Sequence, residues 1–266
     1  MYINLGIIGS PLSHTFSPVI HSHLLNKAGL CGGYSCYEAD LNELDELIRF
    51  FGKYRFKGVN VTVPYKRDIM PFCYKIDKDA EFIGAVNTLK FTEQGIEGYN
   101  TDIFGFSKML ELNGVDIHNK RVLLLGAGGA ARAAFPLFNT GKPDKLVIAN
   151  RTYEKARELA CLYEYDAEIC SLEDLRGMEF DVTINSTSLG LKGAEFPDFA
   201  FKCSEAAIDM IYTPQLTSFL CNFKSQDIQL INGFSMLIWQ AVGSFKIWTD
   251  MDIRPDTEYL QKYMYG

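Results

Sequence analysis

The chain has 266 residues, a length that corresponds to one large domain or two of modest size. Apolar residues make up 47% and charged residues 22%, which excludes collagen-like, disordered and repeat-array proteins. Lys and Arg total 26 against 33 Asp and Glu, so the net charge of −7 gives no general cationic field to attract nucleic acid or an anionic membrane.

The first hundred residues alternate between strand-like and helix-like patterns. Strands are predicted at residues 3–8, 34–39, 57–63, 86–91 and 96–99. One helix is predicted to begin at residue 17, and a second follows Asp40 and ends at about residue 51. Two short helical stretches up to about residue 82 and a helix at 103–112 complete this region. Ser17 would be the N-cap of the first helix, ahead of Pro18, and Asp40 with Glu43 forms a capping box for the second. The turn at residues 93–95 predicts a hairpin.

From Arg121 onward the alternation becomes stricter. The strand-like segments VLLLG, KLVIAN, 168–170 and DVTINST alternate with helices that end near residues 138 and 163, and further units follow at 206–210, 216–223 and 229–231. The chain is predicted to be helical from Gly233 onward. Such β and α units call for a parallel sheet with helices on both faces, so we predict an α/β protein with a domain boundary near residues 101–106.

A glycine-rich turn follows the strand VLLLG and opens an alanine-rich helix. Its residues are Gly126, Ala127, Gly128, Gly129 and Ala130, which fit the pattern G-x-G-x-x-[GA] in its strand-turn-helix context. There the glycines let the backbone approach a pyrophosphate at the helix N-terminus. The alternative is a tight turn that needs glycine for its conformation. No G-K-[ST] follows, which excludes a Walker loop.

The next strand ends at Asn150, Arg151 and Thr152, where dinucleotide folds place the residue that meets the adenine ribose. An acidic residue there would accept from a free 2′-hydroxyl, but Arg151, Thr152 and Lys155 suit a 2′-phosphate. The sequence therefore favours NADP over NAD. In the alternative, both cations are solvated, but they lie unfavourably at the positive end of a helix unless an anion joins them.

A second candidate site lies in the segment VNVTVPYK, residues 59–66. Period-two alternation places three valines on one face and Asn60 with Thr62 on the other, near the carboxyl end of the strand, where ligands bind in open α/β sheets. Lys66 follows directly. It could be a general acid or base, a charge anchor, or a solvated lysine at a helix start.

Each of several other polar residues, taken alone, could have a structural role instead of a functional one. Asn87 is a polar group in a strand, Asp102 could cap a helix, and Gln240 lies on an otherwise apolar helix. The loop at residues 10–17 is dense in hydroxyls, a plausible anchor for a carboxylate.

The sequence gives little support for metal, disulfide or hydrolase chemistry. His21 and His23 are two residues apart on a predicted helix and face different sides, so we expect no metal site from them. No G-x-S-x-G occurs. The seven cysteines are scattered without a C-x-x-C pair, which favours free thiols. The amino terminus has no basic lead and no run of about 18 apolar residues occurs, so we expect a cytoplasmic protein with no membrane span.

Nine motifs in order resemble the shikimate dehydrogenase family nearly from end to end. They are GSPLSHTFSP, GVNVTVPYK, IGAVNTL, GYNTD, GAGGAARA, NRT, INSTSLG, DMIYTPQLT and NGFSMLIWQA. The resemblance implies two domains: an α/β substrate domain, residues 1–103 plus 233–266, and an inserted Rossmann-type NADP-binding domain with a parallel sheet, residues 104–232. It also implies reversible NADPH-dependent reduction of 3-dehydroshikimate to shikimate, a step in aromatic amino acid (chorismate) biosynthesis.

Residue roles follow from the matching motif positions. Lys66 resembles the catalytic lysine of the family and Asp102 its partner at the reacting hydroxyl. The expected substrate-binding residues are Thr15 and Ser17 at the carboxylate, Thr62, Asn87 and Gln240 at the ring hydroxyls, and Tyr212. Asn60 is expected among them from its place beside Thr62 on one face of the strand. Met210 and Gly233 join the glycine-rich turn and the segment at Asn150 as expected cofactor-binding residues.

Thr15 departs from the family pattern, which has serine there. The added methyl group beside the carboxylate can shift discrimination by roughly 1 to 3 kcal/mol. Quinate, with an extra hydroxyl near its carboxylate, is therefore a rival substrate, with NAD as a rival cofactor. A further alternative is a non-catalytic sensor that binds NADP or a metabolite. We expect a monomer or a homodimer.

Overall fold

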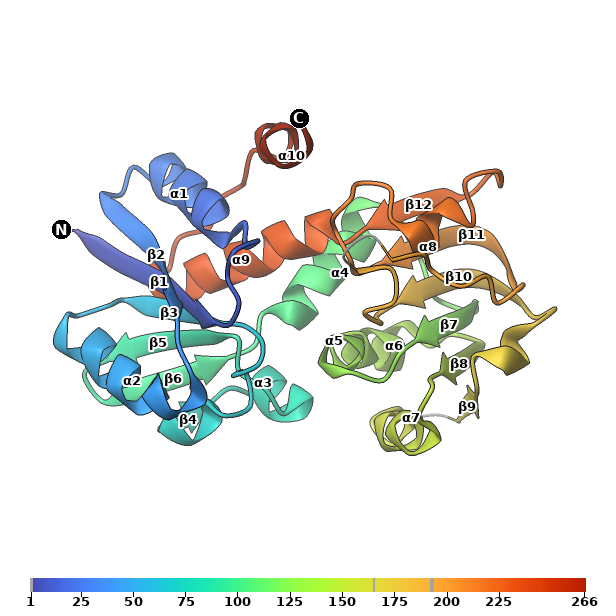
Figure 1. The fold of residues 1–266 in the computed structure, drawn as a ribbon, viewed down its shortest axis with the longest axis horizontal. Helices are drawn as coiled ribbons and strands as arrows, with labels where there is room; N and C mark the ends of the chain where they lie inside the picture. The colour runs from blue at the N-terminus through green and yellow to red at the C-terminus, as the bar shows by residue number, and fades with distance from the viewer. Residues whose placement is uncertain (1, 165, 192–193) are drawn as a thin grey trace. The chain divides into compact units, whose positions relative to one another are not determined.

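The structure is a computed structural model that describes residues 2–164, 166–191 and 194–266. The chain divides into two compact units. The first unit comprises residues 1–105, 238–264 and 266, and the second comprises residues 106–237 and 265. The elements of both are labelled in Figure 1. The unit boundaries lie a few residues from the domain boundaries predicted at 103 and 233.

The first unit is built on a mixed six-stranded sheet in the order β2-β1-β3-β5-β6-β4. Its strands are β1 Ile3–Gly9, β2 Gly32–Glu38, β3 Gly58–Val61, β4 Lys75–Ile76, β5 Thr88–Thr92 and β6 Gly95–Tyr99. Strand β1 is parallel to β2 and β3, whereas β5 runs antiparallel to both β3 and β6. The β5–β6 pair is the predicted hairpin.

The helices α1 Ser17–Lys27, α2 Leu44–Lys53 and α3 Lys78–Ile83 belong to this unit, and α4 Asp102–Leu112 and α9 Phe234–Thr249 each run across a unit boundary. The carboxyl-terminal helix α10 Thr257–Tyr265 contacts α1, where Tyr259 stacks on His23. The predicted capping box at Asp40 is present. The predicted N-cap is wrong by one residue, because Phe16 is the N-cap and Ser17 is already helical.

Strand β3 lies between β1 and β5, so both of its edges are hydrogen-bonded to neighbouring strands. Val59, Asn60 and Val61 are all buried. The predicted strand was too long at its carboxyl end: the chain turns after Val61, and Val63 is 64% exposed instead of facing the core. The short strand β4 was missed because two residues leave no periodic signal.

Helix α9 packs closely on this sheet through Trp248, which is fully buried and donates its indole N–H to the carbonyl of Leu89 at 2.9 Å. A Cβ atom on Gly58 would lie 1.9 Å from the indole nitrogen. Only glycine therefore lets β3 approach the indole ring. This contact makes the carboxyl-terminal helix part of the first unit's core.

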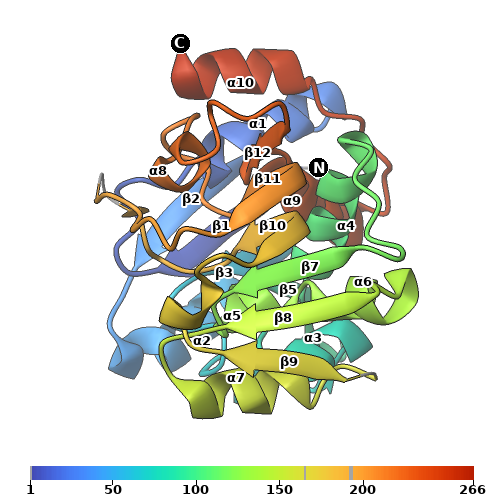
Figure 2. The same ribbon diagram turned by 90° about the vertical axis from the view of Figure 1, so that its right-hand side faces the viewer.

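The second unit has a six-stranded, fully parallel sheet in the order β12-β11-β10-β7-β8-β9 (Figure 2). Its strands are β7 Arg121–Leu125, β8 Lys145–Ala149, β9 Ala167–Cys170, β10 Glu179–Asn185, β11 Lys202–Asp209 and β12 Gln229–Asn232. The chain starts at the centre, winds to one edge, then returns and winds to the other. This is the strand order of a doubly wound dinucleotide-binding sheet. The α/β fold class predicted from the sequence is confirmed.

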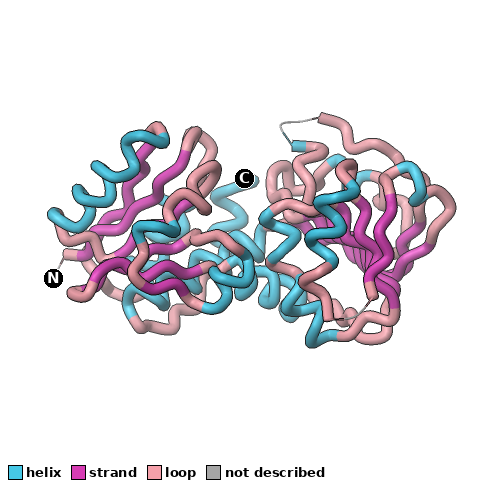
Figure 3. The backbone as a smooth tube through the Cα atoms, turned by 90° about the horizontal axis from the view of Figure 1, so that it is seen from below, coloured by secondary structure: helices cyan, strands magenta, loops and turns pink. Residues whose placement is uncertain are grey.

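Among the described residues, the α-helices between these strands are α5 Gly129–Arg132, α6 Phe135–Gly141, α7 Tyr153–Ala160 and α8 Ser218–Cys221. Figure 3 distinguishes helices from strands in each unit. The single helix predicted up to residue 138 is interrupted between α5 and α6, where Pro136 lies in the first turn of α6. Within the described residues, no helix is long and apolar enough to cross a lipid bilayer.

Candidate functional site

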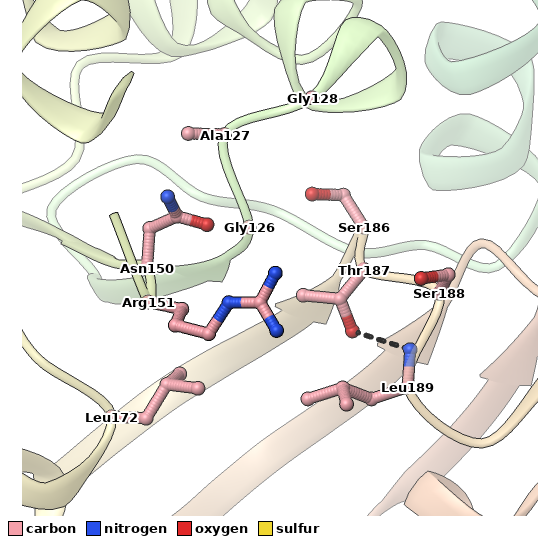
Figure 4. Close-up of a pocket in the computed structure, with 10 residues that line it drawn as sticks. All are labelled: Gly126, Ala127, Gly128, Asn150, Arg151, Leu172, Ser186, Thr187, Ser188 and Leu189. Carbon is pink, nitrogen blue, oxygen red and sulfur yellow. Dashed lines mark hydrogen bonds between the residues drawn. The ribbon is translucent and has the colours of Figure 1, made fainter. Parts of the chain in front are cut away.

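The strand order of the second unit reverses between β7 and β10, and ligands of such sheets bind outside the carboxyl ends of the strands at this point. A cavity of about 280 Å³ opens there (Figure 4). It is lined by Gly126, Ala127, Gly128, Asn150, Arg151, Leu172, Ser186, Thr187, Ser188 and Leu189. The segments that line the cavity therefore follow β10, β7, β8 and β9, four strands that are neighbours in the sheet.

Two glycines of the turn after β7 serve different purposes. Gly126 has φ +99°, and a Cβ atom there would lie 2.8 Å from the hydroxyl of Ser186, so the fold itself requires glycine. Gly128 has an ordinary φ of −88°, and its Cβ atom would have no neighbour within 4 Å. The fold does not require glycine at this position. The open space instead suits a phosphate group that approaches the backbone, so the residues present fit a dinucleotide.

Arg151 follows β8, and its guanidinium points into the cavity (Figure 4). No ion pair joins it to an acidic side chain within the part of the chain that the structure describes. Asn150 beside it donates to the carbonyl of Thr152 at 2.8 Å, which fixes the turn before α7. An uncommitted cation at a cavity suits an anionic group such as a 2′-phosphate.

Several predicted cofactor residues do not line this cavity: Gly129, Ala130, Thr152, Lys155, Met210 and Gly233. Lys155 is exposed on the first turn of α7. Gly233 follows β12, and a Cβ atom there would lie 2.1 Å from the carbonyl oxygen of Met210, so these two backbones pack directly against each other. The cofactor-binding roles of these residues stay predictions.

Sequence reasoning assigned no role to Leu172 or to residues 186–189 of the cavity. The signal was present in the motif INSTSLG, whose polar residues follow a strand next to the reversal point. The hydroxyls of this loop supply hydrogen-bonding groups, and Leu172 with Leu189 supplies apolar walls.

A buried carboxylate holds this loop in place. The Thr187 hydroxyl donates to Asn185 Oδ1 at 2.7 Å, and Asn185 Nδ2 donates to Asp209 Oδ1 at 2.9 Å. The hydroxyl of Thr217 and the backbone N–H of Ile211 also donate to Asp209, at 2.6 and 3.0 Å. Burial raises the pKa of Asp209 to about 6, although these hydrogen bonds oppose the shift.

In the first unit, Lys66, Asp102 and Asn87 come together from three segments. Lys66 Nζ lies 2.8 Å from Asp102 Oδ2, and Asn87 Nδ2 donates to the other carboxylate oxygen at 2.9 Å. The Lys66 and Asp102 side chains are 29% and 15% exposed, so the pair is sheltered but can be reached from solvent. A lysine with a carboxylate partner at such a site can transfer a proton.

Neighbouring backbone contacts fix this cluster. The N–H of Val86 donates to the carbonyl of Lys66 at 2.7 Å, which ties the turn after β3 to the start of β5. At the start of α4, the N–H of Asp102 donates to Asn100 Oδ1 at 2.9 Å. Gln240 reaches the edge of the cluster, where the Thr101 hydroxyl lies 3.5 Å from its Oε1.

The hydroxyls predicted to bind a carboxylate lie together where the loop after β1 meets α1. Thr15 Oγ1 lies 3.2 Å from Ser17 Oγ and accepts from the Ser17 N–H at 3.3 Å. Thr62 lies at the adjacent end of β3, where its N–H donates to the carbonyl of Ile8 at 2.9 Å. Thr62 therefore directly follows β3, while Thr15 and Ser17 belong to the segment that leads from the parallel strand β1 into α1.

Two other candidates have surroundings that sequence reasoning did not anticipate. Asn60 is buried, accepts from the Tyr34 hydroxyl at 2.8 Å and donates to Ser244 Oγ at 3.0 Å, so both ends of its amide contact protein groups. Its contacts favour a structural role. Tyr212 belongs to the second unit, where its carbonyl accepts from the Tyr265 hydroxyl and burial raises the pKa of its own phenol.

The two histidines of α1 face different surroundings, in agreement with their spacing. His21 is fully buried and stacks on Tyr34, with ring centroids 4.3 Å apart. His23 Nε2 accepts from the backbone N–H of Asp256 at 3.0 Å. Across residues 2–164, 166–191 and 194–266, no group of three or more His, Cys, Asp or Glu side chains could hold a metal ion.

Two family models match the chain. One, the shikimate dehydrogenase substrate binding domain, matches residues 7–89 in the first unit, and the other, shikimate / quinate 5-dehydrogenase, matches residues 108–191 in the second. Together they cover more than half of the chain.

Individual relatives are similar over nearly the whole chain. A shikimate dehydrogenase (NADP(+)) from Nitrosopumilus maritimus is 37% identical over 253 residues, which cover 92% of this chain and 93% of that relative. A shikimate 5-dehydrogenase from Thermus thermophilus, solved with NADP(H) and shikimate, has a TM-score of 0.87 and 30% identity over 98% of both chains. A shikimate 5-dehydrogenase from Listeria monocytogenes, solved with shikimate and NAD, has a TM-score of 0.86 and 26% identity, covering 99% of this chain and 96% of that one. The chain therefore belongs to the shikimate dehydrogenase family.

Proposed function

We propose that the protein catalyses the reversible NADPH-dependent reduction of 3-dehydroshikimate to shikimate in aromatic amino acid (chorismate) biosynthesis. The observation that carries the proposal is the Lys66–Asp102 pair, joined at 2.8 Å and braced by Asn87, in a chain that belongs to the shikimate dehydrogenase family. The Rossmann-type sheet and the Arg151 cavity support NADP as the cofactor.

When bound, NADPH supplies the hydride that reduces the ring carbonyl carbon. As the carbon accepts hydride, negative charge develops on the carbonyl oxygen, and the Lys66 ammonium stabilises that charge and donates the proton that completes the hydroxyl. Asp102 accepts a hydrogen bond from Lys66 and orients the ammonium, while Asn87 holds the other carboxylate oxygen. In the oxidation direction, the Lys66 side chain accepts the proton of the substrate hydroxyl.

The remaining residues bind and orient. Thr15 and Ser17 hold the substrate carboxylate, and Thr62, Asn87 and Gln240 hold the ring hydroxyls. Asn60 is assigned to the substrate side from its place beside Thr62 in the strand, and Tyr212 by resemblance alone. The proposed cofactor-binding residues are Gly126, Ala127, Gly128, Gly129, Ala130, Asn150, Arg151, Thr152, Lys155, Met210 and Gly233.

The proposal includes the organisation of the protein. Residues 1–103 with 233–266 form the substrate domain, and residues 104–232 form the NADP-binding domain. The protein acts in the cytoplasm as a monomer or a homodimer.

The test is the initial rate of nicotinamide reduction with shikimate and with quinate, each combined with NADP and with NAD. The proposal predicts the highest kcat/KM for shikimate with NADP. A preference for quinate or for NAD would contradict it. Binding of NADP without turnover of either substrate would also contradict it and would indicate a sensor.

A broader quinate/shikimate dehydrogenase is the second candidate, because of one residue. Thr15 places a methyl group beside the proposed carboxylate anchor, where an extra hydroxyl of quinate would also lie. Thr15→Ser restores the usual family residue and isolates the effect of that methyl group. If the broader function holds, this variant changes the ratio of quinate to shikimate turnover, whereas NADP binding stays the same.

A further inference from the structure

The Asn87 amide has a defined orientation. Its Oδ1 accepts from the Thr88 hydroxyl at 2.7 Å and from the backbone N–H of Thr101 at 3.0 Å. A backbone N–H can only donate, so the oxygen must occupy this position. Nδ2 then faces Asp102 Oδ1 at 2.9 Å. The opposite orientation would place two donors together at Thr101 and two acceptors together at Asp102.

The direction of the Thr88 hydrogen bond determines those behind it. Thr88 has one hydroxyl proton and donates it to Asn87 Oδ1, so toward Ser244 Oγ at 2.8 Å it can only accept. Ser244 therefore donates to Thr88 in preference to the carbonyl of Gln240, which is farther away at 3.1 Å. Asn60 Nδ2 donates to Ser244 at 3.0 Å.

The hydrogen bonds thus run in one direction from Asn60 through Ser244, Thr88 and Asn87 to the Asp102 carboxylate. Thr88 and Ser244 are fully buried, so no water can replace their hydroxyls. In such a low-dielectric chain each bond polarises the next, and a missing member is costly. Ser244 lies one helical turn after Gln240 on α9, so the chain also connects β5 with the carboxyl-terminal helix.

We propose that Thr88 and Ser244 are positioning residues for the reaction: they fix the Asn87 amide, and through it they aim the Asp102 carboxylate at Lys66. The inference rests on the proposed roles of Lys66 and Asp102. Both hydroxyls are fully buried, so they act through the groups that they contact. Thr88 contacts Asn87 directly, and Ser244 contacts Thr88 at 2.8 Å and the hydroxyl of Thr101 at 3.3 Å.

The first test is Thr88→Val, which replaces the hydroxyl by a methyl group of similar size. We expect kcat for shikimate oxidation to fall roughly fivefold to tenfold, the usual effect of one lost hydrogen bond, with KM for NADP unchanged. Thr88→Ser should restore wild-type kcat. The matched control is Thr183→Val, which alters another fully buried strand threonine, in β10, and should leave kcat unchanged.

A double-variant cycle tests whether Thr88 acts through Asn87. Asn87→Ala removes the group that Thr88 orients, so Thr88→Val should reduce kcat no further in that background. If the two losses multiply instead, Thr88 acts by another route and the proposal is overturned.

Ser244→Ala is the independent variant, with an expected loss of kcat of roughly threefold. Ser244→Ala also tests the positioning roles by itself if circular dichroism shows that Thr88→Val does not fold. Wild-type kcat in Ser244→Ala and Thr88→Val, with Lys66→Ala inactive, would overturn the positioning roles and leave the proposed function intact. Wild-type kcat in Lys66→Ala would overturn the proposed catalytic pair, and the positioning roles with it.

Discussion

In the first unit Lys66, Asp102 and Asn87 bind one another, whereas in the second unit Arg151 and Gly128 face open space. The first arrangement pairs its polar groups within the protein, since the Asp102 carboxylate accepts from both Lys66 and Asn87. The second leaves a cation and a bare stretch of backbone for a ligand to satisfy. Contacts within the protein therefore organise the site of the first unit, whereas the site of the second is organised around an anion.

The largest expected effect is that of Lys66→Ala. It removes the proposed acid–base group, so we expect kcat to fall by about 10²- to 10⁴-fold, the usual contribution of such a group. Tight binding of NADPH, followed by its fluorescence, should persist because Lys66 belongs to the first unit. Loss of NADPH binding to the same extent as kcat would show that the two sites are not separable in this way.

Arg151→Ala tests the proposed cofactor site of the second unit. A charge-assisted hydrogen bond contributes roughly 1.5 to 3 kcal/mol, so NADP affinity should fall about 10- to 150-fold, with little change for NAD. Isothermal titration calorimetry gives both values. Lys155→Ala is the matched control with a smaller effect, since Lys155 does not line the cavity. Equal losses for NADP and NAD would contradict the assignment of Arg151 to the 2′-phosphate.

The two units should also respond differently to acid. Burial lowers the pKa of His21 in the first unit to about 3, although an interaction with the Asn60 side chain opposes the shift. Unfolded chain binds this proton below about pH 6.5, so the contribution of His21 to stability is complete above that pH and falls as the pH falls toward 3. His21→Phe keeps an aromatic ring beside Tyr34 but removes this dependence.

Urea unfolding at pH 7 and pH 4.5 measures the His21 effect. We expect wild type to lose roughly 2 to 3 kcal/mol more than His21→Phe over this interval. The contribution of Asp209, in the second unit, to the pH dependence of stability has the opposite sign. Its pKa is raised to about 6, so its ionisation reduces stability as the pH rises through that value. Equal pH slopes in wild type and His21→Phe would contradict the prediction.

The smallest expected effects distinguish the two glycines. Gly128→Ala fills open space, so the melting temperature should hold while NADP affinity falls roughly tenfold, because the methyl group blocks the approach of a phosphate to the backbone. Gly126→Ala forces a side chain onto φ +99°, which should destabilise the fold by about 1 kcal/mol or more. A lower melting temperature for Gly128→Ala, with its NADP affinity unchanged, would show that the fold, and not a ligand, requires Gly128.

Local patterns were enough to predict most of the fold. The βα alternation after Arg121 gave the parallel sheet, and the turn at residues 93–95 gave the hairpin. The mixed order of the first sheet could not be read in this way, because strand pairing depends on contacts between distant segments. The exposed position of Val63 was missed for a related reason: period two holds only while the strand continues.

The candidate site was predictable in part. Motif positions identified Lys66, Asp102 and Asn87, which the structure brings together. The hydroxyl of Ser244 behind them was not identified, because it comes from a helix 156 residues away from Thr88 and has no local signal. The loop at residues 186–189 was part of a recognised motif, but only the folded strand order shows that it borders the cavity.

The contact between Gly58 and Trp248 has a consequence during protein synthesis. The second unit is almost one continuous stretch of chain, whereas the sheet surface at Gly58 stays uncovered until Trp248 has been made. At usual elongation rates, the roughly 140 residues that separate the end of the first segment from Trp248 take about 7 to 30 s to translate. During that interval the ribosome holds an apolar sheet without its helix, so the nascent first unit is the part of the protein most exposed to chaperones and to aggregation.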